Sequence, residues 1–139
     1  MTITTTRTTT PDVGAGAPAL IGTGLAATAA AGVATVLTAV AGRAAGISLD
    51  VSGAPIPVSG FAVLTVACSL LGLILAAVLA RTARHPRRAF VRTTVILTVV
   101  SLVPDVIVDA TPATRALLML THVVAAAIVI PAVARRLSV

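Results

Sequence analysis

Four long apolar runs, almost free of charge, are the feature that most limits what this chain can fold into. They cover residues 19–41, 60–80, 90–110 and 116–134. An α-helix rises ~1.5 Å per residue, so about 20 apolar residues cross a hydrocarbon core of ~30 Å. Inside lipid a helix also satisfies all of its own backbone hydrogen bonds. The sequence therefore predicts an all-α fold, a four-helix transmembrane bundle with up-down connectivity.

Composition supports a membrane protein over a soluble one. The chain is 58% hydrophobic and 10% charged, whereas about a quarter of the residues are charged in soluble domains. All basic residues are arginines, and most of them flank the apolar runs. We therefore interpret the net charge of +6 as arginines that orient the chain in the membrane. We expect no nucleic-acid partner, because these arginines form no continuous face on a soluble domain.

The two ends of the chain differ in character. Residues 1–17 are rich in threonine and lack an apolar pattern, which predicts a disordered cytoplasmic tail before a membrane domain over residues 18–139. A cleaved signal peptide is the competing interpretation. It is disfavoured because Arg7 is the only basic residue before the first apolar run, and because that run is too long for the apolar region of a signal peptide.

Arginine distribution predicts the orientation. Eight of the ten arginines fall on one side of the predicted membrane, and only Arg43 and Arg115 fall on the other. The positive-inside rule then places both termini in the cytoplasm of a cell-membrane protein that crosses several times. Besides Arg7, the residues expected to set this orientation and to contact the headgroups of the lipid bilayer are Arg81, Arg84, Arg87, Arg88, Arg92, Arg135 and Arg136.

The two connections on the opposite side have their own signals. Residues 47–51 alternate apolar and polar, and the turn residues Ser52 and Gly53 follow. This pattern predicts a short extracytoplasmic β-hairpin between the first and second spans. Thr111 suits the helix N-cap position and Pro112 the first helical position, so the third and fourth spans are expected to be adjacent and antiparallel.

Small residues recur every fourth position in the first span. One stripe holds Gly22, Ala26, Ala30 and Ala34, and a second holds Gly24, Thr28 and Gly32. Small side chains let membrane helices approach closely, so we expect this helix to be well surrounded by neighbours. Cys68 lies within the second span, where it is expected to act as a small apolar residue.

Few polar residues inside the spans could carry a function. Asp105 and Asp109 are four residues apart at the far end of the third span, Ser101 continues their face, and His122 lies in the fourth span. Folding the chain at Pro112 places Asp105 level with His122, roughly 8–10 Å below the membrane surface. We expect these two side chains to meet, with Asp109 closer to Arg115, Arg43 or the start of the fourth span.

Three interpretations of this candidate polar site stay open. It could be a cluster of hydrogen-bonded polar side chains that fixes helix packing in a structural protein. It could instead be a proton-linked transport or ligand site, or the active site of a membrane enzyme with His122 as base. We assign no catalytic residue, because a Ser101–His122–Asp105 triad would draw two members from one helix without an oxyanion hole. No metal or cofactor motif is present, and His85 lies among arginines as a solvated residue.

Three segments resemble a known family, and they read IPVSGFAVLTVACSLLGLILAAVL, PRRAFVRTTVILTVVSLVPD and HVVAAAIVIPAVARRL. They are similar to an uncharacterised actinobacterial family of small four-span membrane proteins, catalogued as a domain of unknown function. The resemblance implies a four-helix bundle and brings no activity or site residue. We expect a structural or interaction role through helix packing, with a homo-oligomer or another membrane protein as partner.

Overall fold

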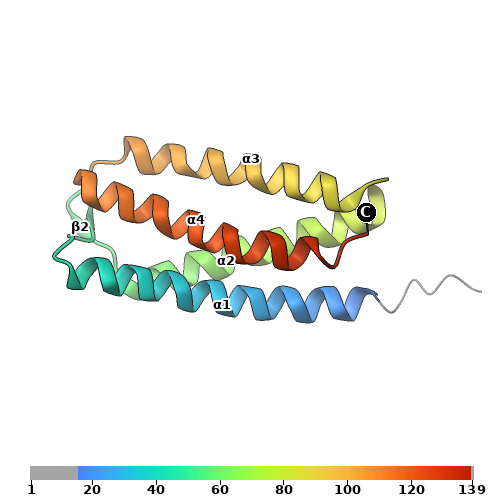
Figure 1. The fold of residues 1–139 in the computed structure, drawn as a ribbon. Helices are drawn as coiled ribbons and strands as arrows, with labels where there is room; N and C mark the ends of the chain where they lie inside the picture. Colours follow the sequence, from blue (N-terminus) through green and yellow to red (C-terminus); the bar gives the residue numbers. More distant parts are fainter. Residues whose placement is uncertain (1–15, 139) are drawn as a thin grey trace, which may run out of the picture.

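The computed structural model describes residues 16–138, which form four long helices and one small hairpin. The helices are α1 (Gly16–Ala44), α2 (Val58–Thr82), α3 (Pro86–Ile107) and α4 (Pro112–Ala134). They lie side by side, and successive helices run in opposite directions (Figure 1). The predicted four-helix bundle with up-down connectivity is confirmed. The expected tail lies outside the described residues, except for positions 16 and 17, which begin α1.

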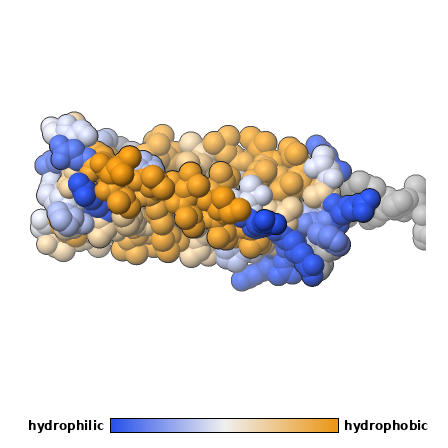
Figure 2. All heavy atoms as spheres, turned by 90° about the horizontal axis from the view of Figure 1, so that it is seen from above, coloured by the Kyte–Doolittle hydropathy of each residue, from blue (hydrophilic) through white to orange (hydrophobic). Residues whose placement is uncertain are grey.

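Each of these four helices is long and apolar enough to cross a membrane. On the face that Figure 2 shows, a hydrophobic belt crosses the middle of the molecule, and hydrophilic residues gather at both ends. Large apolar side chains such as Leu64, Val99 and Ile107 are more than half exposed on this belt. In water such a surface would be unfavourable, whereas lipid chains solvate it. The architecture fits a multi-pass integral membrane protein.

The predicted hairpin between α1 and α2 is also present. Strand β1 (Asp50–Val51) pairs antiparallel with β2 (Ala54–Pro55), and Val51 lies opposite Ala54. The connecting residues Ser52 and Gly53 both have positive φ, 52° and 78°. Positive φ at both central residues is the signature of a type I′ turn, whose twist matches that of the paired strands. The local sequence therefore determines this element.

The first helix is the centre of the packing. It contacts α2 and α4 most extensively, while α3 packs chiefly against α4. Gly24 leaves room for Leu73 of α2, and Gly42 leaves room for Leu117 of α4. Between α1 and α2 the hydroxyls of Thr35 and Thr65 share a hydrogen bond of 3.0 Å. Small side chains thus bring the backbones close, as the sequence predicted for one face of this helix.

The two stripes of small residues on α1 nevertheless face in different directions. Gly24, Thr28 and Gly32 are buried inside the bundle, whereas Gly22, Ala26 and Ala30 are exposed on its outer surface, with Ala34 half-buried. The helix is thus well packed against its neighbours on one face, as expected, and exposed on the other within a single chain. The other three helices all lie on one side of α1, which leaves the stripe of Gly22, Ala26 and Ala30 uncovered.

Helix ends differ from the expected spans at both ends of the bundle. Helix α2 runs to Thr82 and α3 begins at Pro86, so Arg81, Arg87 and Arg88 lie on helical turns and the loop between them is only three residues long. At the other end α3 stops at Ile107, three residues short of the expected boundary at 110. Helix α4 already begins at Pro112, so the turn between α3 and α4 covers residues 108–111 and contains Asp109.

Candidate intramembrane polar site

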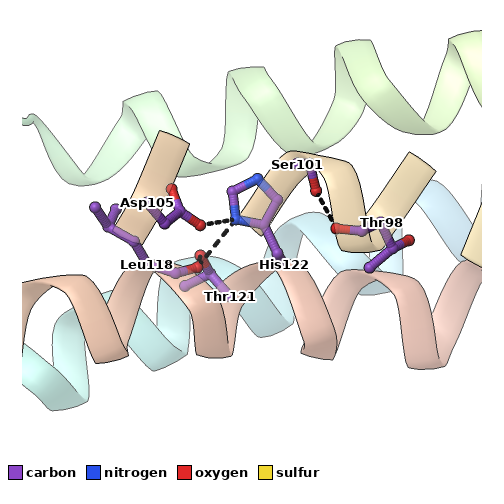
Figure 3. Close-up of polar contacts among 6 residues, drawn as sticks. All are labelled: Thr98, Ser101, Asp105, Leu118, Thr121 and His122. Atoms are coloured by element: carbon purple, nitrogen blue, oxygen red, sulfur yellow. Dashed lines mark hydrogen bonds and ion pairs between the residues drawn. The ribbon is translucent and has the colours of Figure 1, made fainter. Parts of the chain in front are cut away.

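The structure brings together Asp105 of α3 and His122 of α4. Asp105 Oδ2 lies 2.9 Å from His122 Nδ1, so the two side chains form an ion pair whenever the imidazole is protonated (Figure 3). The side chain of Asp105 is 11% exposed, whereas that of His122 is 40% exposed. The carboxylate is therefore buried and the imidazole is half-buried. The pair lies towards the end of the bundle that carries the hairpin.

A single imidazole nitrogen faces two acceptors in this site. Nδ1 of His122 also lies 3.1 Å from the carbonyl oxygen of Leu118, with hydrogen-bond alignment. Asp105 Oδ2 is within ion-pair distance but has no aligned hydrogen bond among the described residues. We treat the contact as electrostatic, because alignment decides which acceptor receives the N–H. The carboxylate is thus buried and incompletely satisfied.

Ser101 and Asp109, the other two predicted site residues, do not join this pair. The Ser101 hydroxyl donates to the carbonyl of Thr98, 2.7 Å away on its own helix (Figure 3). Asp109 lies beyond the end of α3 and is exposed, so it shares no helical face with Asp105. A triad with Ser101 as nucleophile has no support in this geometry.

Threonines and serines satisfy most of the remaining polar atoms within their own helices. Their hydroxyls donate to carbonyls three or four residues earlier, a common arrangement in membrane helices. The hydroxyls that do so are those of Thr28, Thr35, Thr38, Thr82, Thr94, Thr98, Ser101 and Thr121. On α3 the hydroxyls of Thr94, Thr98 and Ser101 are therefore already hydrogen-bonded to their own helix, and none of the three donates to Asp105.

The hairpin end is held by hydrogen bonds that sequence reasoning missed. The backbone N–H of Ser52 donates to the Asp109 carbonyl at 2.7 Å, and the Thr114 hydroxyl donates to the Ser48 carbonyl at 2.6 Å. Arg115 Nε donates to the Val108 carbonyl at 3.0 Å, not to the Asp109 carboxylate as expected. The N-cap is the one contact in this group that the sequence predicted: the backbone N–H of Thr114 donates to the Thr111 hydroxyl at 3.2 Å.

The opposite end of the bundle is strongly basic. Seven of the arginines lie there, in the last turn of α2, the loop that follows it, the first two turns of α3 and the residues after α4. Of these, Arg136 donates from Nε to the hydroxyl of Thr23, 2.9 Å away. The acidic residues of the described part, Asp50, Asp105 and Asp109, all lie towards the hairpin end. No acidic side chain between residues 16 and 138 neutralises this basic end.

Comparison with known proteins places the chain in one family without adding an activity. Residues 15–139 match the model of a family of unknown function, DUF6069. No curated protein and no solved structure matched the chain. The match covers nearly the whole chain, including all four helices and the polar pair.

Proposed function

Because the chain belongs to DUF6069, a family of unknown function, its role must be inferred from its own residues, and we propose that it is an interaction protein of the membrane. In this proposal copies of the chain pair through the outward face of α1. The observation that carries it is the exposed stripe of Gly22, Ala26 and Ala30, which no other helix covers. Small residues on a lipid-facing helix are typical of helix–helix interfaces.

An apolar groove beside this stripe supports pairing with a second copy of the chain. A shallow apolar groove of about 320 Å³ lies beside it, between α1 and α2, and its lining includes Ala29, Val33 and Val66. In a twofold pair each copy offers the same surface, so the two α1 helices would cross near Ala26, with larger side chains of one copy in the groove of the other. Van der Waals packing is the main driving force for such contacts in lipid.

Cross-linking between copies tests the pairing. In a chain with Cys68 replaced by alanine, Ala26→Cys should form a disulfide between copies in native membranes under mild oxidant, since Cα atoms must come within about 7 Å. Ala67→Cys is the matched control, because Ala67 is exposed on α2. Cross-linking at 67 but not at 26 would contradict the proposed face.

Loss of association provides the second arm of this test. Ala26→Leu should abolish pairing in single-molecule photobleaching of bilayers, because a larger side chain separates the backbones. Ala67→Leu should leave the pairing unchanged. A wild-type chain that bleaches in one step at every density would contradict the proposal.

We also propose that the protein lies in the cell membrane, with both termini in the cytoplasm and the hairpin outside. The arginine asymmetry supports this orientation, because short cytoplasmic connections are enriched in basic residues. An actinobacterial source is inferred from the resemblance and from the excess of alanine, valine and arginine. The hairpin would then cap the outer end of the bundle, close to Asp105 and His122.

A second candidate function, a proton-linked transporter or ligand-binding protein, rests on the exposure of His122. Its side chain is 40% exposed in a membrane span and lies next to a buried, incompletely satisfied carboxylate. Ionisable groups in spans are costly and usually mark a functional path. A thermal-shift screen in detergent would detect a ligand, since specific binding raises apparent stability. The shift should vanish in Asp105→Asn and His122→Ala if the pair contacts that ligand.

A further inference from the structure

The start of α3 carries an open hollow lined by three arginines. Arg87, Arg88 and Arg92 surround a space of about 490 Å³, and the half-buried Val91 forms its apolar floor. Arg88 and Arg92 are one turn apart on the helix, so their guanidinium groups can reach the same ligand. All three side chains are exposed, and no ion pair holds them within residues 16–138. The hollow is therefore a concentrated site of positive charge.

The surrounding backbone adds to this charge. The hollow lies at the amino end of α3, where the helix dipole is positive and the N-cap residue His85 forms no side-chain hydrogen bond. Arg87 N–H is held by the carbonyl of Ser138, 3.3 Å away, which fixes the end of the chain against this turn. A phosphate group is the natural ligand, because guanidinium groups bind it through paired hydrogen bonds.

An apolar strip continues from the hollow along the same face of α3. Ile96, Val99 and Val103 follow Arg92 at helical spacing and are 52%, 60% and 55% exposed. From Arg92 to Val103 the helix rises ~16 Å, about half the thickness of a hydrocarbon core. This is the length of one acyl chain that descends from the membrane surface. A soluble phosphate would use only the hollow, whereas a phospholipid uses both features.

We propose that the hollow and the strip together form a binding site for an anionic phospholipid. The phosphate lies among Arg87, Arg88 and Arg92, and an acyl chain follows α3 towards Val103. The site differs from general attraction between basic residues and the membrane, because it depends on three of the seven arginines at this end. In the proposed orientation it faces the cytoplasmic leaflet, whose negative surface potential reflects its anionic lipids.

Native mass spectrometry of the full chain in detergent tests the site. We expect the wild type to retain phosphatidylglycerol and to lose phosphatidylcholine under the same conditions. The triple variant Arg87→Gln, Arg88→Gln and Arg92→Gln should weaken retention of phosphatidylglycerol by about tenfold or more, since the phosphate loses its paired hydrogen bonds with the guanidinium groups. The matched control combines Arg81→Gln, Arg84→Gln and Arg135→Gln, which removes the same charge at the same end and should leave retention nearly unchanged.

Three outcomes would overturn the proposal. Equal loss in the control variant would mean that only net charge matters. Equal retention of both lipids by the wild type would remove the requirement for an anionic headgroup. Binding of inorganic phosphate as tight as that of phosphatidylglycerol would make the hollow a site for a soluble anion. If the triple variant does not fold, Arg92→Gln against Arg81→Gln decides in the same assay.

Discussion

At the residue scale, sequence spacing predicted the contact between Asp105 and His122 but not the hydrogen bonds around it. Folding the chain at Pro112 predicted that the two side chains meet, and Asp105 Oδ2 indeed lies 2.9 Å from His122 Nδ1. Sequence could not reveal that the Leu118 carbonyl competes for the same imidazole nitrogen, because every residue offers such a carbonyl. It also could not show that Ser101 bonds to its own helix. Backbone acceptors carry no sequence signature.

The first prediction concerns the unequal burial of this pair. His122→Ala leaves a buried carboxylate without its partner, so it should destabilise the protein by about 1–3 kcal/mol. Asp105→Ala should cost less, because the half-exposed imidazole keeps the Leu118 carbonyl as its acceptor. The double variant should lose less than the sum of the two, with a coupling of about 0.5–3 kcal/mol. Unfolding by SDS in mixed micelles measures all three, and strict additivity would contradict the contact.

At the element scale, the sequence predicted the number and type of elements better than their ends. Arginines were taken to end the spans at the basic side, yet α2 and α3 continue through Arg81 and Arg88. Arginine is a good helix former whose long side chain reaches water from a membrane helix. At the other side α3 ends early because the hairpin and Arg115 supply hydrogen bonds to the carbonyls of the turn.

A second prediction tests the close approach of α1 and α2. A side chain at Gly24 would meet the end of Leu73 at 2.5 Å, whereas Gly72 has nothing within 4 Å. Gly24→Leu should therefore destabilise the bundle by about 1–3 kcal/mol through overpacking. Gly72→Leu, the matched control on α2, should be neutral or stabilise the protein by up to about 1 kcal/mol, because glycine is a poor helix former. Equal effects in SDS unfolding would show that this face of α1 is not packed as described.

A third prediction concerns the contact between the hairpin loop and α4. Thr114 is 1% exposed, and its hydroxyl donates to the Ser48 carbonyl. Thr114→Val removes this donor and should cost about 0.5–1.5 kcal/mol, because a part-buried hydrogen bond to the Ser48 carbonyl is lost. Thr82→Val is the control, since that exposed hydroxyl bonds only within its own helix. Faster hydrogen exchange at residues 48–56 in the first variant alone is the expected readout, and unchanged exchange would contradict the contact.

At the scale of the whole molecule, hydropathy predicted most of the architecture. Four apolar runs predicted four helices, and the helices of the structure can each cross a membrane. Which stripe of α1 faces inwards could not be predicted, because Gly22 and Gly24 begin stripes of similar composition. Only the position of α2 and α4 relative to α1 separates them. The proposed pairing therefore depends on tertiary structure and not on the small-residue pattern alone.

Four membrane crossings with the arginine-rich end in the cytoplasm are the basis of both proposals, and site-directed labelling tests them most directly. In a chain with Cys68 replaced by alanine, cysteine is introduced at the exposed positions 85 or 54. An impermeant maleimide applied to intact cells should label Ala54→Cys and leave His85→Cys unlabelled until the membrane is opened. Labelling of His85→Cys from outside, or of both positions from the same side, would contradict the account.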